Sequence, residues 1–130
     1  MKKFIILDSN VAIGLLKDDG KVIHMIQSLR NEGYGFCFSV ISLCELISGA
    51  KSTHELQALN RINRNRFIDV NFDIAVLAGE IRREQKTKQN RVIKTPDSLI
   101  VATAIHKKFG LFTFDKGMRF ASEYGVHLVE

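Results

Sequence analysis

Short apolar runs alternate with amphipathic helical segments along the whole chain, and this alternation limits the possible folds more than any other feature. The runs have the length and the β-branched or aromatic content of buried strands. They cover residues 4–7, 36–40, 67–70, 111–114 and 126–129. Strands that alternate with helices favour a three-layer α/β domain, in which helices flank a mainly parallel central sheet.

The segments between these runs carry apolar residues at helical spacing. We expect the last long helix to begin with Thr95 as its N-cap, Pro96 at its first position and Asp97 in its first turn. Gly33 is expected to cap an earlier helix, and residues 115–117 are expected to form a turn. The other helices are expected from Ser9 or Asn10 onward, from residue 22, over 41–50, within the polar stretch 52–66 and over 74–88.

The composition suits a single domain over residues 1–130. The chain is 45% hydrophobic and has one proline, and no linker-like stretch divides it. No apolar run approaches the ~20 residues of a membrane-spanning helix, and Asp8 follows the apolar start too early for a signal peptide. Cys37 and Cys44 form no CxxC pair, so we expect reduced, buried thiols and a cytoplasmic protein. The net charge of +5 weakly favours a polyanionic partner such as nucleic acid.

Four acidic residues stand where strands end or helices start. Asp8 and Asp115 end strands, Glu45 lies in the helix after the second strand, and Asp97 opens a helix. In an open α/β sheet these positions share one edge, so the four carboxylates could converge there. Without a partner they would repel one another, and oxygen ligands without His or Cys select a hard cation, Mg²⁺ or Mn²⁺.

Each acid also has a simpler interpretation. Asp8 could only cap the next helix, and Asp97 suits a helix N-terminus for dipole reasons. Asp115 before Lys-Gly is an ordinary turn residue. Glu45 could lie on the solvent side of its helix, although Ile41 and Gly49 on the same face favour an apolar or close-packed surface there. None of the four is diagnostic alone.

The segments around the acids, taken in order, resemble the four acidic motifs of PIN-domain ribonucleases, and the small single-domain form is similar to the VapC-type toxins of bacterial toxin-antitoxin pairs. The resemblance covers essentially the whole chain. Two departures are mild: Asn90 stands where a glycine is common, and residues 116–120 are a loose version of the usual ending. The resembling segments are residues 6–13, 39–49, 96–104 and 111–115.

The resemblance implies a Mg²⁺- or Mn²⁺-dependent endoribonuclease that cuts single-stranded or looped RNA. Asp8, Glu45, Asp97 and Asp115 would be its catalytic, metal-binding acids. Asn10 and Thr113 fall at positions where the family often has a polar side chain that orients a ligand or water, although helix capping and β-propensity explain them equally well. The resemblance also implies a homodimer and an antitoxin protein that blocks the acidic pocket.

Other interpretations remain at this point. An RNA-processing nuclease without an antitoxin would carry the same acids, and a basic α/β module could bind RNA or a protein without cutting. A phosphorylated receiver domain is disfavoured, because the chain lacks its acidic pair and a convincing mid-chain Asp. A basic helix face could guide the RNA backbone, but a merely solvated face is the favoured interpretation. That face carries Arg82, Arg83, Lys86 and Lys88.

Overall fold

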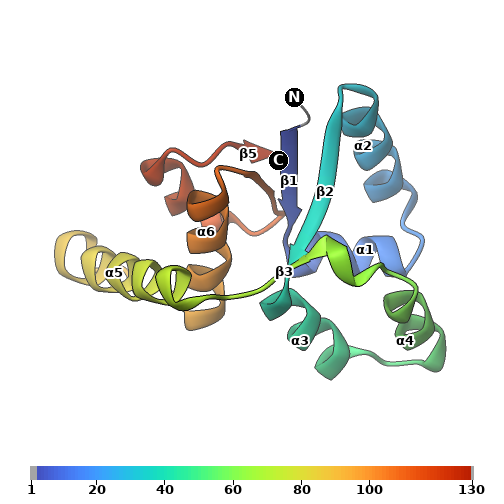
Figure 1. Cartoon of the computed structure of the whole chain (residues 1–130), viewed down its shortest axis with the longest axis horizontal. Coiled ribbons are helices and arrows are strands. Elements are labelled where there is room, and N and C mark those ends of the chain that lie inside the picture. The colour runs from blue at the N-terminus through green and yellow to red at the C-terminus, as the bar shows by residue number, and fades with distance from the viewer. Residues whose placement is uncertain (1–2, 130) are drawn as a thin grey trace.

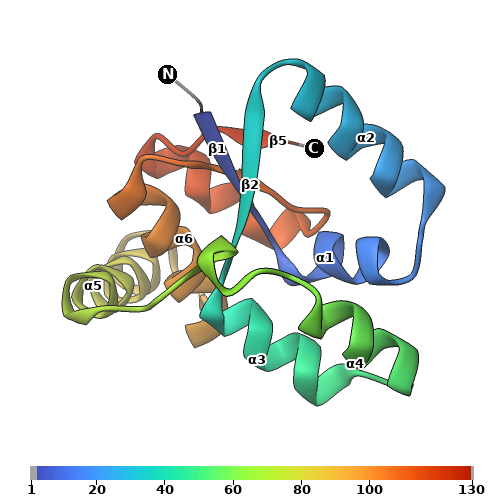
Figure 2. The same cartoon turned by 45° about the vertical axis from the view of Figure 1, so that its right-hand side comes forward.

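A five-stranded parallel sheet lies between two layers of helices in the computed structural model, which describes residues 3–129 (Figures 1 and 2). The predicted α/β class is confirmed, and every strand pairing is parallel. The strands run in the order β3-β2-β1-β4-β5. Their bounds are β1 Lys3–Leu7, β2 Tyr34–Ser39, β3 Phe67–Ile68, β4 Gly110–Phe112 and β5 Leu128–Val129.

The helices divide between the two faces of the sheet. Helices α1, α2 and α4 cover one face, α5, α6 and the 3₁₀ segment η2 cover the other, and α3 lies beside the edge to which β1 points (Figure 1). The helical segments are α1 Ser9–Leu16, α2 Gly20–Asn31, α3 Val40–Gly49, α4 Thr53–Asn60, η1 Arg64–Arg66, α5 Phe72–Gln89, α6 Thr95–Lys107 and η2 Lys116–Tyr124.

The central strand β1 supplies both halves of the core. Ile5 and Leu7 belong to the apolar cluster under α1 and α2, whereas Ile6 belongs to the cluster under α5 and α6. Successive side chains of a strand point to opposite faces, so an uninterrupted apolar run is what a strand covered on both faces needs. This double burial holds the end of β1, and therefore Asp8, in a fixed position.

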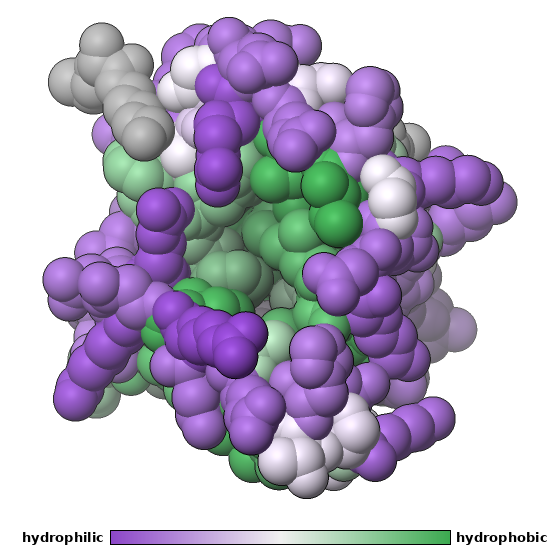
Figure 3. Space-filling view, turned by 90° about the vertical axis from the view of Figure 1, so that its right-hand side faces the viewer, coloured by the Kyte–Doolittle hydropathy of each residue, from purple (hydrophilic) through white to green (hydrophobic). Residues whose placement is uncertain are grey.

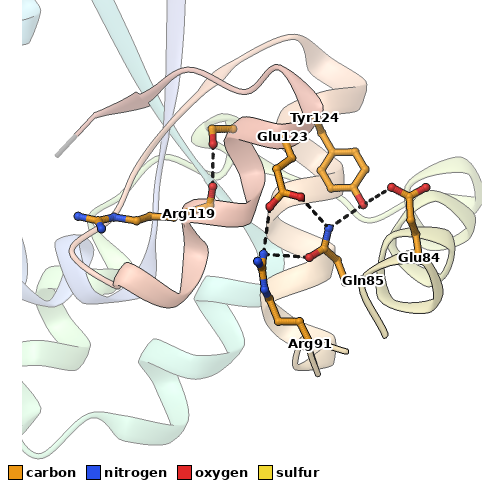
Figure 4. A network of polar contacts seen from close by, with 7 residues as sticks. Glu84, Gln85, Arg91, Arg119, Glu123 and Tyr124 are labelled. Carbon is orange, nitrogen blue, oxygen red and sulfur yellow. Dashed lines mark hydrogen bonds and ion pairs between the residues drawn. The ribbon is translucent and has the colours of Figure 1, made fainter. Parts of the chain in front are cut away.

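A polar network joins the end of α5 to η2 on the outer layer (Figure 4). The buried amide of Gln85 donates to the Tyr124 hydroxyl at 3.2 Å and accepts from Arg91 Nη1 at 3.0 Å. Arg91 Nη1 also lies 3.0 Å from Glu123 Oε2. Asn90 precedes this arginine with φ 50°, a left-handed conformation that asparagine tolerates, so this position does not need a glycine.

Several local predictions were wrong. The edge strands β3 and β5 have two residues each instead of four. Lys94, without a side-chain cap, is the N-cap of α6, because Thr95 is already helical. Residues 115–117 do form a turn, with a 3.0 Å bond from the Met118 N–H to the Asp115 carbonyl, and the turn continues into η2. The polar stretch 52–66 divides into α4 and η1. Cys37 is buried as expected, whereas Cys44 is exposed.

No helix within residues 3–129 is both long enough and apolar enough to cross a membrane.

Candidate active site

The carboxyl ends of β1 and β4 and the starts of α3 and α6 lie at one edge of the sheet, the lower edge in Figure 1. Asp8 directly follows β1 and Asp115 follows β4 after two residues. Glu45 lies in α3, the helix after β2, and Asp97 is in the first turn of α6. The topology therefore places the four acids on the side where ligands bind in open α/β sheets.

Asp8 is the most buried of these acids, with 6% of its surface exposed. Its Oδ1 accepts a 2.9 Å hydrogen bond from the Ser9 backbone N–H, so the capping interpretation is correct. Its Oδ2 accepts a 2.7 Å bond from the Thr113 hydroxyl. Although Asp8 caps α1, its carboxylate charge stays buried at the site, where it can also attract a cation.

Thr113 and Asn10 connect Asp8 to the segment after β4. The Thr113 hydroxyl also accepts from the Asp115 backbone N–H at 3.0 Å and from the Asn10 amide at 3.4 Å. The Asn10 carbonyl oxygen accepts from the Phe114 N–H at 3.1 Å. Both side chains therefore orient Asp8 and the backbone that carries Asp115, which is more than helix capping or β-propensity requires.

Glu45 is exposed on α3, and its Oε1 accepts a 2.7 Å bond from the Ser9 hydroxyl. Sequence reasoning missed Ser9, although its position between Asp8 and Asn10 was the available signal. The expected close packing near Gly49 is absent, because no atom lies within 4 Å of where a Cβ would stand. The expected apolar surface is present, because Glu45 lines a hollow with Ile13 and Leu46. The Ser9 hydroxyl holds the Glu45 carboxylate toward the end of β1.

The acids affect one another electrostatically. Burial is the largest cause that raises the pKa of Asp8, while the Thr113 hydrogen bond lowers it and the charges of Glu45 and Asp115 raise it further. Burial likewise raises the pKa of Asp97, followed by the charges of Asp8, Asp115 and Glu45, with Lys94 opposing. Asp8 and Asp97 thus both feel neighbouring carboxylates as like charges, and a cation at this edge would relieve the repulsion.

The donor set fits a hard divalent cation that keeps part of its water shell. Within residues 3–129 no three His, Cys, Asp or Glu side chains stand close enough together to enclose a metal ion. The four acids are electrostatically coupled but spread over the edge. Mg²⁺ keeps several waters and takes one or two carboxylates directly, so a spread set of oxygen donors suits it better than a closed cage would.

The basic face of α5 lies on the outer helical layer, next to the loop before α6. Helix α5 extends away from the sheet on the side opposite α1 (Figure 1). Arg82 Nε donates to the Ile93 carbonyl at 2.8 Å, and Lys88 lies 3.8 Å from Glu84. Arg83 and Lys86 line a shallow hollow with Arg82. The structure thus gives Arg82 a role in the loop before α6, and none of the four basic side chains is among the charges that shift the pKa of Asp8 or Asp97.

The face covered by α2 and α4 has an apolar hollow ringed by polar side chains (Figure 3). We call it the α2–α4 groove. Its volume is about 380 Å³, and Leu7 at its base is the last residue of β1, immediately before Asp8. The remaining lining residues are Leu15, Ile26, Arg30, Phe36, Phe38, Arg61, Ile62, Asn63 and Arg66.

A sequence model of the PIN domain matches residues 5–123. The chain belongs to the PIN domain family. This family comprises nucleases, and the match confirms the resemblance that the four acidic segments indicated. No curated protein sequence is similar enough to count as a match.

Solved toxin-antitoxin structures share this PIN fold along nearly the full chain. A toxin-antitoxin complex from Klebsiella pneumoniae is 27% identical, with a TM-score of 0.71 and coverage of 97% of this chain and 96% of that one. DNA-bound VapBC from Salmonella typhimurium is 25% identical, with a TM-score of 0.75 and coverage of 99% and 98%. VapBC2 from Rickettsia felis, bound to a promoter DNA fragment, is 22% identical, with a TM-score of 0.76 and coverage of 97% of each chain.

Proposed function

We propose that this PIN domain is a Mg²⁺- or Mn²⁺-dependent endoribonuclease and the toxin of a toxin-antitoxin pair. The observation that carries the proposal is the group of acids at the carboxyl edge of the sheet, where the pKa of Asp8 and of Asp97 is raised by burial and by the neighbouring carboxylates. Keeping the buried Asp8 and the half-buried Asp97 near other carboxylates is costly unless they bind a cation, and the nuclease activity of the family gives a reason for a cation there.

Asp8, Glu45, Asp97 and Asp115 would hold the ion in this proposal. A divalent ion at this edge would supply an activated water and offset the negative charge that builds up on the scissile phosphate. Thr113 and Asn10 keep Asp8 in one orientation, and Ser9 does the same for Glu45. These contacts preorganise the acids, so little reorganisation is needed when RNA and metal arrive.

The direct test is cleavage of RNA by the purified protein. End-labelled RNA should be cut in Mg²⁺ or Mn²⁺ and remain intact in EDTA, and by analogy with the family the products should carry 5′-phosphate and 3′-hydroxyl ends. Those ends can be identified by their response to a phosphatase and to a 5′-phosphate-dependent exonuclease. Full activity in EDTA would contradict the proposal, and RNA binding without cleavage under every metal condition would favour a non-catalytic module.

The α2–α4 groove supports an antitoxin as the partner. Its base is apolar and its rim carries Arg30, Arg61 and Arg66, so it is complementary to an amphipathic segment with acidic residues beside its apolar face. A segment bound there would lie next to the end of β1, because Leu7 lines the groove and Asp8 follows it. We infer that the antitoxin docks in this groove and reaches the acids from it.

We expect a short neighbouring reading frame whose product binds this protein and stops RNA cleavage. Arg61→Glu on the exposed rim should weaken that complex at least tenfold by reversing a charge, and Lys21→Glu on the outside of α2 should not. Calorimetry or a pull-down with the neighbouring product measures both. Equal affinities for the two variants would place the antitoxin elsewhere, and the absence of any such partner would favour an RNA-processing role.

The homodimer implied by the resemblance stays a prediction. Phe72 and Val76 expose 80% and 44% of their surface on α5 and are the apolar side chains that such an interface would cover.

A further inference from the structure

A pair of half-buried aromatic rings lines a hollow at the end of the sheet opposite the acids. The ring centroids of Phe4 and Phe109 are 5.3 Å apart, with the planes inclined by 39°. Both rings and Lys107 line this hollow of about 850 Å³, and they also line a second hollow of about 560 Å³. We call the larger hollow, together with the ring pair, the basal groove.

Cations and aromatic rings dominate the larger hollow. Lys3, Lys107 and Lys108 line it together with His127, and none of its lining residues within the described part of the chain is Asp or Glu. Besides Phe4 and Phe109, the rings of Tyr34 and Tyr124 form its walls. The hydroxyl of Tyr124 is already engaged, since it donates to Glu84 Oε1 at 3.0 Å and accepts from Gln85 Nε2 at 3.2 Å. The polar network in Figure 4 therefore holds one wall of the groove in place.

The basal groove is separate from the acidic edge. Lys3 is the first residue of β1 and Asp8 follows its last. Five steps along a strand of about 3.3 Å each put the two positions about 16 Å apart. In Figure 1 the groove residues Lys3 and Lys107 belong to the upper ends of β1 and α6, and the acids belong to the lower edge. A ligand in the groove therefore does not touch the residues proposed to cut RNA.

We propose that the basal groove binds a single-stranded segment of the RNA substrate away from the bond that is cut. Single-stranded nucleic acid is held by cations along its backbone and by aromatic rings on which its bases stack, and the groove combines both. The helix dipole of α6 explains a lysine at its C-terminus but not the ring pair beside it. The inference rests on the proposed function for the identity of the ligand, and it adds a second contact region to that function.

The charge component is tested by binding measurements in EDTA, with Asp8→Asn as the background so that no RNA is cut. Fluorescence anisotropy with an unstructured RNA of about 12 nucleotides should show that Lys107→Ala weakens binding about fivefold. The slope of log affinity against log salt concentration should become less steep by about 0.7, the contribution of one phosphate contact in a single strand. Lys21→Ala is the matched control, because Lys21 is exposed on α2 and lines neither hollow. Adding Lys21→Ala to the Asp8→Asn background should leave the affinity for the RNA unchanged.

The stacking component is tested at Phe109. Phe109→Leu should weaken binding by about 5- to 100-fold, the cost of losing one base stack, whereas Phe109→Tyr should restore it. Thermal melting of each variant separates a stacking effect from unfolding. If Lys107→Ala and Phe109→Leu both bind the RNA as tightly as Lys21→Ala does, the proposal is wrong.

Two competitors identify the ligand. AMP at millimolar concentration should displace the RNA only weakly, because one nucleotide fills part of the groove; complete displacement would assign the groove to free nucleotides instead. A poly-glutamate peptide that competes as well as RNA would assign it to an acidic protein. If the groove variants lose RNA affinity but the wild-type protein never cuts RNA, the nuclease proposal is wrong and the proposal of RNA binding in the groove is supported. If the groove variants cut and bind RNA like the wild type, only the proposal of RNA binding in the groove is wrong.

Discussion

Replacing Asp8 with asparagine is expected to slow RNA cleavage about 10³-fold while the protein stays folded. Asparagine caps helices as well as aspartate does, so the bond to the Ser9 N–H can be kept while the carboxylate charge is lost. Asp8 is the most buried of the acids, is bonded to Thr113 and feels the charges of Glu45 and Asp115. Single-turnover cleavage of end-labelled RNA in Mg²⁺ measures the rate, and circular dichroism checks the fold.

Asp18→Asn is the matched control for this substitution. Asp18 is exposed after α1 with φ 56°, a conformation that asparagine adopts at least as readily, and the residue does not belong to the acidic edge. Its cleavage rate should equal that of the wild type. A rate for Asp8→Asn within threefold of the control would remove Asp8 from the proposed mechanism.

Neutralising the acids should also change how stability depends on pH in the absence of metal. The pKa of Asp8 and of Asp97 lies above the ordinary value of 3.8 in the folded protein. Between that value and the raised pKa the folded state binds more protons than the unfolded state, so the free energy of unfolding falls as pH rises through this window. Asp97→Asn should reduce the fall, and Mg²⁺ should raise the melting temperature of the wild type at neutral pH. Urea denaturation in EDTA from about pH 4 to pH 8 measures the slope.

Thr113→Val is expected to lower the cleavage rate about 10- to 100-fold, the usual cost of losing a partner that orients a metal ligand. Valine has the shape of threonine but cannot donate the 2.7 Å bond to Asp8 Oδ2 or accept the 3.0 Å bond from the Asp115 N–H. Because that donated bond lowers the pKa of Asp8, its loss should raise the pKa and move the rise of the pH–rate profile to higher pH.

Thr113→Ser separates the hydroxyl from the methyl group. Serine keeps the donor and the acceptor, so its cleavage rate and pH profile should stay close to those of the wild type. If valine keeps the wild-type cleavage rate while serine does not, Thr113 acts by packing, and its proposed role in orienting Asp8 is wrong.

The identity of the acids could be predicted from local sequence, because each follows a recognisable signal. An apolar run of four residues ends at Asp8, and Pro96 opens a helix directly before Asp97. The rule that such ends share one edge of a parallel sheet then placed them together. The same reasoning did not predict what holds the Glu45 side chain. Its partner is Ser9, 36 residues earlier, and helical periodicity contains no information about a contact over that separation.

Local patterns of hydrophobicity therefore account for the α/β class, the order of the elements and the strand-end acids, since each depends on neighbours within a few residues along the chain. The contacts that orient the site depend on how distant segments meet. The Thr113 hydroxyl lies 105 residues from the carboxylate to which it donates, and Asn10 bonds across a gap of 103 residues to reach Thr113. Phe4 and Phe109 likewise become one ring pair only because β1 pairs with β4. Long-range packing, which leaves no periodic trace in a single sequence, decided the electrostatics of the acidic edge and created the basal groove.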